Sequence, residues 1–99
     1  MSQSSSAHRA MVEDPEGRSV RLTEERWSHI VAGHPELQDH EQAILRAVVA
    51  PSRTMPGRRT GEEWCYLEGA GPSRWLKVVV AYEDMSGAII TAFARRSIP

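Results

Sequence analysis

The chain has 99 residues, with 12 Lys and Arg against 13 Asp and Glu, which gives a formal net charge of −1 at pH 7. This length allows one modest hydrophobic core and leaves no room for a second. The near-neutral charge excludes the broad basic field that marks a general nucleic-acid-binding protein. No apolar run approaches the ~20 residues that cross a bilayer, and the single cysteine, Cys65, fits a reducing compartment. We therefore expect a cytoplasmic protein that does not contact membranes.

The N-terminal residues contain many serines and show no hydrophobic periodicity. We expect residues 1–14 to form a flexible N-terminal tail and residues 15–99 to form a single α+β domain. The domain begins with the turn sequence PEG, and the following RSVRL, residues 18–22, is typical of a short edge strand.

A first helix is predicted over residues 23–33. Thr23 can cap it, and two glutamates in its first turn stabilise the positive end of the helix dipole. Its apolar residues recur at i, i+3 and i+4 and predict a buried stripe of Trp27, Ile30 and Val31. His29 lies about 200° around the helix from Trp27, on the same polar side as Arg26. A histidine beside an arginine suits acid–base chemistry on a phosphate, whereas the simpler interpretation is a solvated helix face.

A second helix is predicted over residues 39–50. Pro35 disfavours helical geometry at His34, so the first helix ends there and His34 lies at a corner. Asp39 can cap the second helix, and Gln42 completes a capping-box pattern. The buried face of this helix is expected to consist of Ile44, Leu45, Val48 and Val49.

From residue 52 onward the hydrophobic pattern changes to a period of two. Four segments are candidate strands: residues 52–55, 62–68, 74–82 and 88–95. The third is apolar at nearly every position and is predicted to be the central strand. Two helices followed by these strands predict an α+β fold with the helices on one face of an antiparallel sheet.

The last hairpin carries a second chemical signal. Pairing of Gly87 with Glu83 fixes which residues of its two strands lie opposite each other. The opposite pairs are then Thr91 with Val79, Phe93 with Lys77, and Arg95 with Trp75. Alternation places a hydroxyl, two cations and two aromatic rings on one face, which suits the binding of a nucleotide: Thr91, Lys77, Arg95, Trp75 and Phe93. Taken singly, Thr91 is more simply a β-forming residue and Arg95 a solvated charge, and the face that Tyr66 joins stays open.

Several segments resemble small phage- and toxin-associated domains: LTEERWSHIVAGHPEL, VVAPSRTM, WCYLE, WLKVVVAY and GAIITAFARR. Those domains belong to the barnase/EndoU/colicin/RelE-like superfamily of metal-independent endoribonucleases. The likeness covers residues 17–97 and implies two N-terminal helices packed on a four-stranded antiparallel sheet, with the active site on the exposed face of the sheet. It also implies RNA as the substrate, a cognate antitoxin or immunity protein as a partner, and neither a metal nor a cofactor.

The resemblance, together with residue chemistry, nominates two groups of site residues. The expected catalytic residues are His29, His34, Thr91 and Arg95. The expected substrate-binding residues are Arg26, Arg58, Tyr66, Trp75 and Lys77. Histidine can act as acid or base near neutral pH, arginine binds phosphate, and aromatic rings stack on bases. Two interpretations of His34 stay open: an acid–base partner of His29, or a hydrogen-bonding cap at the helix corner.

Two other functions remain as alternatives. The same fold can serve as a catalytically inactive RNA- or protein-binding module in a toxin or phage system, which the near-neutral charge favours. A transition-metal site could instead be built from His29, His34 and nearby carboxylates. The five-residue spacing of these histidines fits ligation poorly, because two ligands on one helix face stand four residues apart.

Overall fold

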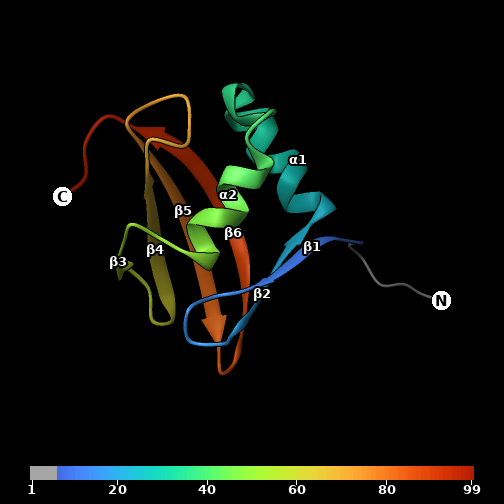
Figure 1. Ribbon diagram of the computed structural model, residues 1–99. Helices are drawn as coiled ribbons and strands as arrows, with labels where there is room; N and C mark the ends of the chain where they lie inside the picture. The colour runs from blue at the N-terminus through green and yellow to red at the C-terminus, as the bar shows by residue number, and fades with distance from the viewer. Residues whose placement is uncertain (1–6) are drawn as a thin grey trace.

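The computed structural model describes residues 7–99, which form an α+β fold with one six-stranded sheet (Figure 1). The strands are β1 (His8–Glu13), β2 (Ser19–Thr23), β3 (Arg53–Pro56), β4 (Glu62–Glu68), β5 (Trp75–Glu83) and β6 (Ser86–Arg95). The helices are α1 (Glu24–Gly33) and α2 (Glu41–Val49), separated by the short 3₁₀ helix η1 (Pro35–Leu37). The strand order is β1-β2-β6-β5-β4-β3, in which β2 and β6 run parallel and the other neighbours are antiparallel. Both α-helices lie on the same face of the sheet (Figure 1).

The expected arrangement of two N-terminal helices on a four-stranded antiparallel sheet is wrong. Two strands precede the helices, the sheet has six strands, and the parallel pairing of β2 with β6 makes it mixed. The segment predicted to be an edge strand forms β2, but it lies between β1 and β6 rather than at an edge.

Strand β1 accounts for most of this difference. Residues 8–13, expected to belong to the tail, pair with β2 along their length. Arg9 anchors the strand to both helices, since its guanidinium donates to the carboxylate of Glu41 at 2.7 and 3.0 Å and to that of Glu24 at 3.0 Å. These partners lie far away in the sequence, so a local pattern does not reveal them. Residues 1–6 of the expected tail lie outside the described residues.

Helix α1 begins as the sequence predicts. Thr23 Oγ1 accepts a hydrogen bond from the backbone N–H of Arg26 at 3.1 Å. Trp27 and Ile30 are buried against the sheet, and His29 is exposed, as the helical spacing requires. The cap, the burial of Trp27 and Ile30 and the polar side of this helix are therefore confirmed, whereas Val31, the third residue of the predicted stripe, is only partly buried.

Helix α2 begins later than expected. Its N-cap is His40, whose side chain makes no capping hydrogen bond, so the predicted cap by Asp39 and its capping box with Gln42 are wrong. The physical reason is η1. Leu37 is fully buried, and its carbonyl oxygen accepts the backbone N–H of His40 at 2.9 Å. The chain is therefore still turning at Asp39.

The hydrophobic core lies between the helices and the covered face of the sheet. Its fully buried aliphatic side chains are Val20, Leu22, Ile30, Leu37, Ile44, Val48, Leu76, Val78, Val80 and Ile89. Ile90 of β6 is apolar but does not belong to this core. Val80 pairs with Ile89, but the preceding Val79 pairs with Thr91, so Ile90 is the extra residue of a β-bulge. Ile89 takes the core position in its place.

The same bulge sets the register of the β5–β6 hairpin. The expected pairing of Gly87 with Glu83 is wrong, because Gly87 pairs with Tyr82. Beyond the bulge, where β6 has gained one residue, the predicted pairs are confirmed: Thr91 with Val79, Phe93 with Lys77, and Arg95 with Trp75. The predicted face therefore forms through a turn and a bulge that the sequence pattern did not reveal.

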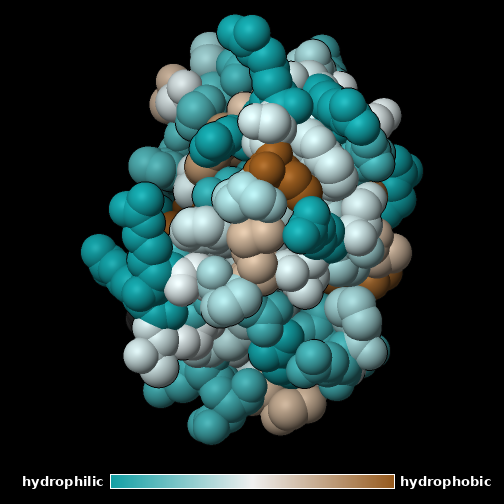
Figure 2. Space-filling view, turned by 90° about the vertical axis from the view of Figure 1, so that its left-hand side faces the viewer, coloured by the Kyte–Doolittle hydropathy of each residue, from teal (hydrophilic) through white to brown (hydrophobic). Residues whose placement is uncertain are grey.

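Helix length and surface hydropathy bear on contacts with membranes and with other proteins. No helix within residues 7–99 is long and apolar enough to span a membrane. Figure 2 shows the side of the molecule that lies to the left in Figure 1, where hydrophobic colour is limited to small separate spots among hydrophilic residues. That side therefore offers no broad apolar surface of the kind that marks a docking interface.

Candidate functional site

The face of the sheet that the helices leave open carries charged, hydroxyl and aromatic side chains. Alternate residues of a strand point to the same face, and the register of neighbouring strands aligns them. This register brings together Trp64 and Tyr66 of β4, Trp75, Lys77 and Val79 of β5, and Thr91, Phe93 and Arg95 of β6. Tyr66 lies directly opposite Lys77, so it joins this face, which answers the question that the sequence left open.

Lys77, the only lysine in the sequence, lies at the centre of this face. The residue is 7% exposed, and its Nζ lies 3.5 Å from the ring centroid of Trp64, 5.2 Å from that of Phe93 and 5.9 Å from that of Tyr66. Cation–π attraction to these rings stabilises the ammonium. No hydrogen bond or ion pair within residues 7–99 does so. Lys77, Trp64, Tyr66 and Phe93 together are called the Lys77 cluster. Because its ammonium is enclosed by rings and forms no ion pair, the cluster is suited to receive an anion.

The surroundings of the Lys77 cluster are positively charged. Burial lowers the pKa of Lys77, and the charges of Arg95 and Arg58 lower it further. Glu62 acts in the opposite direction. Burial raises the pKa of Tyr66, an effect that the charge of Arg95 partly counters. Several cations therefore act on this face against one nearby carboxylate, which favours a negatively charged ligand.

The remaining expected residues border the Lys77 cluster. The ring of Trp75 meets that of Tyr66 edge-on, with the centroids 6.3 Å apart. The guanidinium carbon of Arg95 lies 5.9 Å from the ring centroid of Phe93. Arg58 is exposed on the loop between β3 and β4, close enough to act on the pKa of the buried lysine. The structure therefore brings these expected substrate-binding residues together.

A groove of about 550 Å³ adjoins the cluster. It is lined by Arg26, Arg59, Thr60, Glu62, Val79, Ala81, Ile90 and Thr91. The β-bulge supplies both Ile90 and Thr91 to the groove. Val79 and Thr91 also pair in the same row as Trp64, so the groove continues directly into the Lys77 cluster.

The two candidate catalytic histidines occupy different surroundings. The ring of His34 stacks on that of Phe93, with the centroids 5.5 Å apart and the planes inclined at 26°. Its side chain is 37% exposed, and its Nδ1 lies 3.6 Å from an oxygen of Glu36. Its backbone N–H caps α1 by donating to the carbonyl of Ile30 at 2.7 Å, whereas its side chain makes no capping hydrogen bond. His29 is exposed and makes no hydrogen bond, ion pair or ring contact with the cluster. It stands one turn along α1 from Arg26, which lines the groove.

One important residue of this face, Trp64, is missing from the residues that the sequence predicted. Trp64 supplies the ring nearest to the ammonium of Lys77, and its Nε1 donates to Glu62 at 3.4 Å. The alternation in residues 62–68 does predict that Trp64 and Tyr66 share a face. What no local pattern supplies is the register of β4 against β5, which decides what those rings contact.

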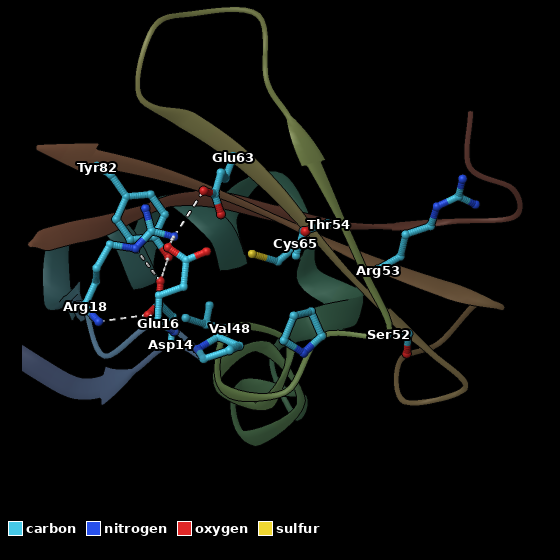
Figure 3. A pocket seen from close by; sticks show the side chains of 12 residues that line it. Asp14, Glu16, Arg18, Val48, Ser52, Arg53, Thr54, Glu63, Cys65 and Tyr82 are labelled. Carbon is cyan, nitrogen blue, oxygen red and sulfur yellow. Dashed lines mark hydrogen bonds and ion pairs between the residues drawn. The ribbon is translucent and has the colours of Figure 1, made fainter. Parts of the chain in front are cut away.

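A second pocket, of about 320 Å³, lies on the helix side of the sheet (Figure 3). Asp14 Oδ2 accepts hydrogen bonds from Tyr82 Oη at 2.9 Å and from Arg18 Nε at 2.7 Å. Arg18 also donates to Glu63 at 3.1 Å and stacks over the ring of Tyr82, 3.6 Å from its centroid. Cys65 lines the same pocket, where burial raises the pKa of its thiol to about 12. The charged groups here are paired with one another, so they hold the β1–β2 turn against the sheet.

Two further observations bear on identity. Within the described part of the chain, no three His, Cys, Asp or Glu side chains lie close enough together to hold a metal ion. Comparison of the chain with protein-family models, with curated proteins and with solved structures finds no match. The resemblance to ribonuclease domains therefore stays a prediction from the sequence, and the chemistry of the open face carries the functional argument.

Proposed function

We propose that the chain is a metal-independent endoribonuclease that binds RNA across the open face of the sheet. The observation that carries this proposal is Lys77, a buried residue whose ammonium is surrounded by aromatic rings and makes no hydrogen bond or ion pair within residues 7–99. A phosphodiester supplies the missing negative charge, and hydrogen bonds between charged groups are the stronger ones. RNA also brings bases that stack on aromatic side chains.

The layout of the face suggests how RNA is bound. A phosphate lies against Lys77 and Arg95, and the exposed ring surface of Trp75 beside them is available for stacking. The adjoining groove takes a neighbouring nucleobase, since its lining includes the apolar side chains of Val79 and Ile90. Two arginines in the same lining provide further phosphate contacts. Binding therefore relies on a few local cations rather than on a broad basic surface.

Cleavage requires a base for the 2′-hydroxyl proton and cations for the charge that develops on the phosphate oxygens. His34 takes the proton as the 2′-oxygen bonds to phosphorus, because it is the histidine that stacks on this face. The bond from phosphorus to the 5′-oxygen then breaks, and that oxygen takes a proton from water. The products carry a 2′,3′-cyclic phosphate and a 5′-hydroxyl. Lys77 and Arg95 stabilise the phosphorane during this step.

The test is an assay of the purified chain against mixed RNA in the presence of EDTA. We expect products with 2′,3′-cyclic phosphate ends and a rate that chelation leaves unchanged. His34→Ala should lower the rate by about 100- to 10,000-fold while the Kd for RNA changes little, because cations provide most of the binding. His29→Ala is the matched variant and should have a smaller effect. A wild-type protein that binds RNA but leaves it intact would contradict the catalytic part.

A catalytically inactive RNA-binding module is the second candidate. One observation favours it: within residues 7–99, His34 is the one histidine whose ring contacts an aromatic residue of the open face. A single histidine gives a weaker acid–base apparatus than a pair. In either case, the resemblance of the sequence extends the proposal to a cytoplasmic toxin or phage system, with a cognate antitoxin or immunity protein as partner. Intact RNA bound with unchanged affinity by wild type and His34→Ala would support this candidate.

A further inference from the structure

One carboxylate organises the loop of residues 57–61 between β3 and β4. Glu62 Oε1 accepts the backbone N–H groups of both Arg58 and Arg59, each at 3.0 Å. The backbone of Glu62 closes the same loop, since its N–H donates to the carbonyl of Arg59 at 3.0 Å and its carbonyl accepts from Gly57 at 2.7 Å. The other carboxylate oxygen, Oε2, accepts from the indole of Trp64 at 3.4 Å.

The glycines at the two ends of this loop fit that arrangement. A Cβ at Gly57 would lie 2.5 Å from Cγ of Glu62, so a larger residue there would displace the carboxylate side chain. Gly61 has a φ of +83°, and a Cβ there would lie 2.6 Å from the carbonyl oxygen of Tyr82. The backbone N–H of Tyr82 in turn donates to Gly61 at 2.8 Å, which ties the loop to β5. Both glycines therefore permit the close packing of the loop around the Glu62 carboxylate.

Both partners of this carboxylate belong to the proposed RNA-binding face. The loop places Arg59 in the lining of the groove, which also includes Arg26 of α1. Trp64 supplies the ring that covers the ammonium of Lys77 at 3.5 Å. The backbone N–H of Arg59 lowers the pKa of Glu62, an effect that burial opposes and the bonds from Trp64 and Arg58 reinforce. The Glu62 side chain is thus a carboxylate at neutral pH. It accepts hydrogen bonds from the backbone of Arg59, which lines the groove, and from the indole of Trp64, which covers the ammonium of Lys77.

We infer, on the basis of the function proposed above, that Glu62 is a positioning residue for RNA binding. Glu62 also lines the groove, but the role inferred for it is to position the groups around it. Its carboxylate fixes the loop of residues 57–61 and the ring of Trp64 relative to each other, so that the groove and the Lys77 cluster form one continuous site. Loss of this carboxylate leaves the strands in place but lets the loop and the ring move independently.

Two variants of equal charge isolate this role. Glu62→Gln and Glu62→Ala both remove the negative charge and the acceptor for the indole of Trp64, but the glutamine Oε1 still accepts the backbone N–H groups of Arg58 and Arg59, so the pair tests the loop contacts. We expect the Kd for a short single-stranded RNA to be about tenfold higher for Glu62→Ala than for Glu62→Gln. Amide hydrogen exchange at Arg58 and Arg59 should be fast in Glu62→Ala and slow in Glu62→Gln.

Glu63→Gln is the matched control, because Glu63 is the next residue of β4 and faces Arg18 on the opposite side of the sheet. It should leave RNA binding unchanged. Far-ultraviolet circular dichroism should show that all three variants are folded. Equal Kd values for Glu62→Ala and Glu62→Gln, in a wild type that binds RNA, would overturn the positioning role alone. A wild type that binds no RNA would overturn the proposed function and this inference with it.

Discussion

Replacement of Lys77 by methionine separates the binding role of the ammonium from any structural role. Methionine keeps a long unbranched side chain but removes the charge. In the folded protein Lys77 is largely buried and its ammonium forms no ion pair within residues 7–99, so partial loss of hydration makes the charged form less favourable. The ring of Trp64 at 3.5 Å partly compensates. These effects have opposite signs, so their magnitudes decide the result.

The magnitudes favour a more stable but poorly binding variant. Replacement of buried ionic groups by apolar residues of similar volume is often neutral or stabilising by about 1–4 kcal/mol, and the lost cation–π contact costs about 0.5–2 kcal/mol. We expect the free energy of unfolding to rise by about 1 kcal/mol, which corresponds to a rise in Tm of about 4–8 °C for a domain of this size. Loss of a charged hydrogen bond to phosphate costs about 1.5–3 kcal/mol, or roughly a 10- to 150-fold rise in Kd for RNA.

The pH dependence provides an independent check on Lys77. Burial lowers the pKa of Lys77 in the folded state below its ordinary value of 10.5. Between the lowered pKa of Lys77 in the folded state and its value of 10.5 in the unfolded chain, the unfolded chain binds more protons than the folded one. The wild-type protein therefore gains stability as pH rises through this range. The stability advantage of Lys77→Met should therefore be full below the lowered pKa and should shrink as pH rises toward 10.5.

Thermal unfolding and fluorescence anisotropy with labelled RNA measure the two effects of Lys77→Met. Arg74→Met is the control, because it removes the same charge from an exposed side chain that pairs with Glu68. The control should change Tm and Kd little, since exposed ion pairs contribute little stability. A Lys77→Met protein with a lower Tm and unchanged RNA affinity would refute the reasoning, because it would show that the lysine serves the fold.

Three further predictions concern other parts of the molecule. Asp14→Asn should lower the free energy of unfolding by about 1.5–3 kcal/mol at pH 7. Burial alone would raise the pKa of Asp14, but hydrogen bonds from Arg18 and Tyr82 lower it overall, so urea titrations should show this difference closing as pH falls below about 3.9. Cys65 should react slowly with a thiol reagent at pH 8 in the folded protein and rapidly in urea, because burial raises its pKa to about 12; fast reaction in the folded state would contradict its burial. Arg95→Ala should raise the Kd for RNA and reduce the slope of log Kd against log salt by about 1, whereas an unchanged slope would place the phosphate elsewhere.

Local signals predicted the parts of the fold that depend on neighbouring residues. Thr23 caps α1 because the cap needs only a side chain and an N–H three residues later. The same logic failed at Asp39, because burial of Leu37 keeps the chain in a 3₁₀ turn at that point. Strand β1 was missed for a related reason: Arg9 reaches Glu41 across the fold, and that contact leaves no trace in a local pattern.

The candidate site was predictable in composition but not in arrangement. Alternation along β5 and β6 placed Lys77 and Phe93 on one face, and the structure confirms their pairing. The burial of Lys77 under Trp64 depends on the pairing of β4 with β5, which the sequence left ambiguous. The contact of His34 with the same face depends on how the end of α1 packs over β6, a tertiary feature outside any sequence window.

The near-neutral net charge is compatible with RNA binding once the ion pairs are located. Arg9 pairs with two glutamates, and Arg18 pairs with Asp14 and Glu63, so these cations are neutralised within the fold. Within residues 7–99, Lys77, Arg58 and Arg95 have no such partner.

The open face of the sheet therefore carries cations that no ion pair neutralises, although the chain as a whole carries −1. Long-range attraction to nucleic acid scales with the summed charge of the protein. A direct contact between a phosphate and the ammonium of Lys77 depends instead on the local charge and on the local dielectric. Each phosphate neutralised on a single strand contributes about −0.7 to the salt slope. Lys77, Arg95 and the two groove arginines thus predict a slope near −3, shallower than that of a basic nucleic-acid-binding domain. A steep slope would mean that RNA is held by the remaining surface arginines rather than by the Lys77 cluster.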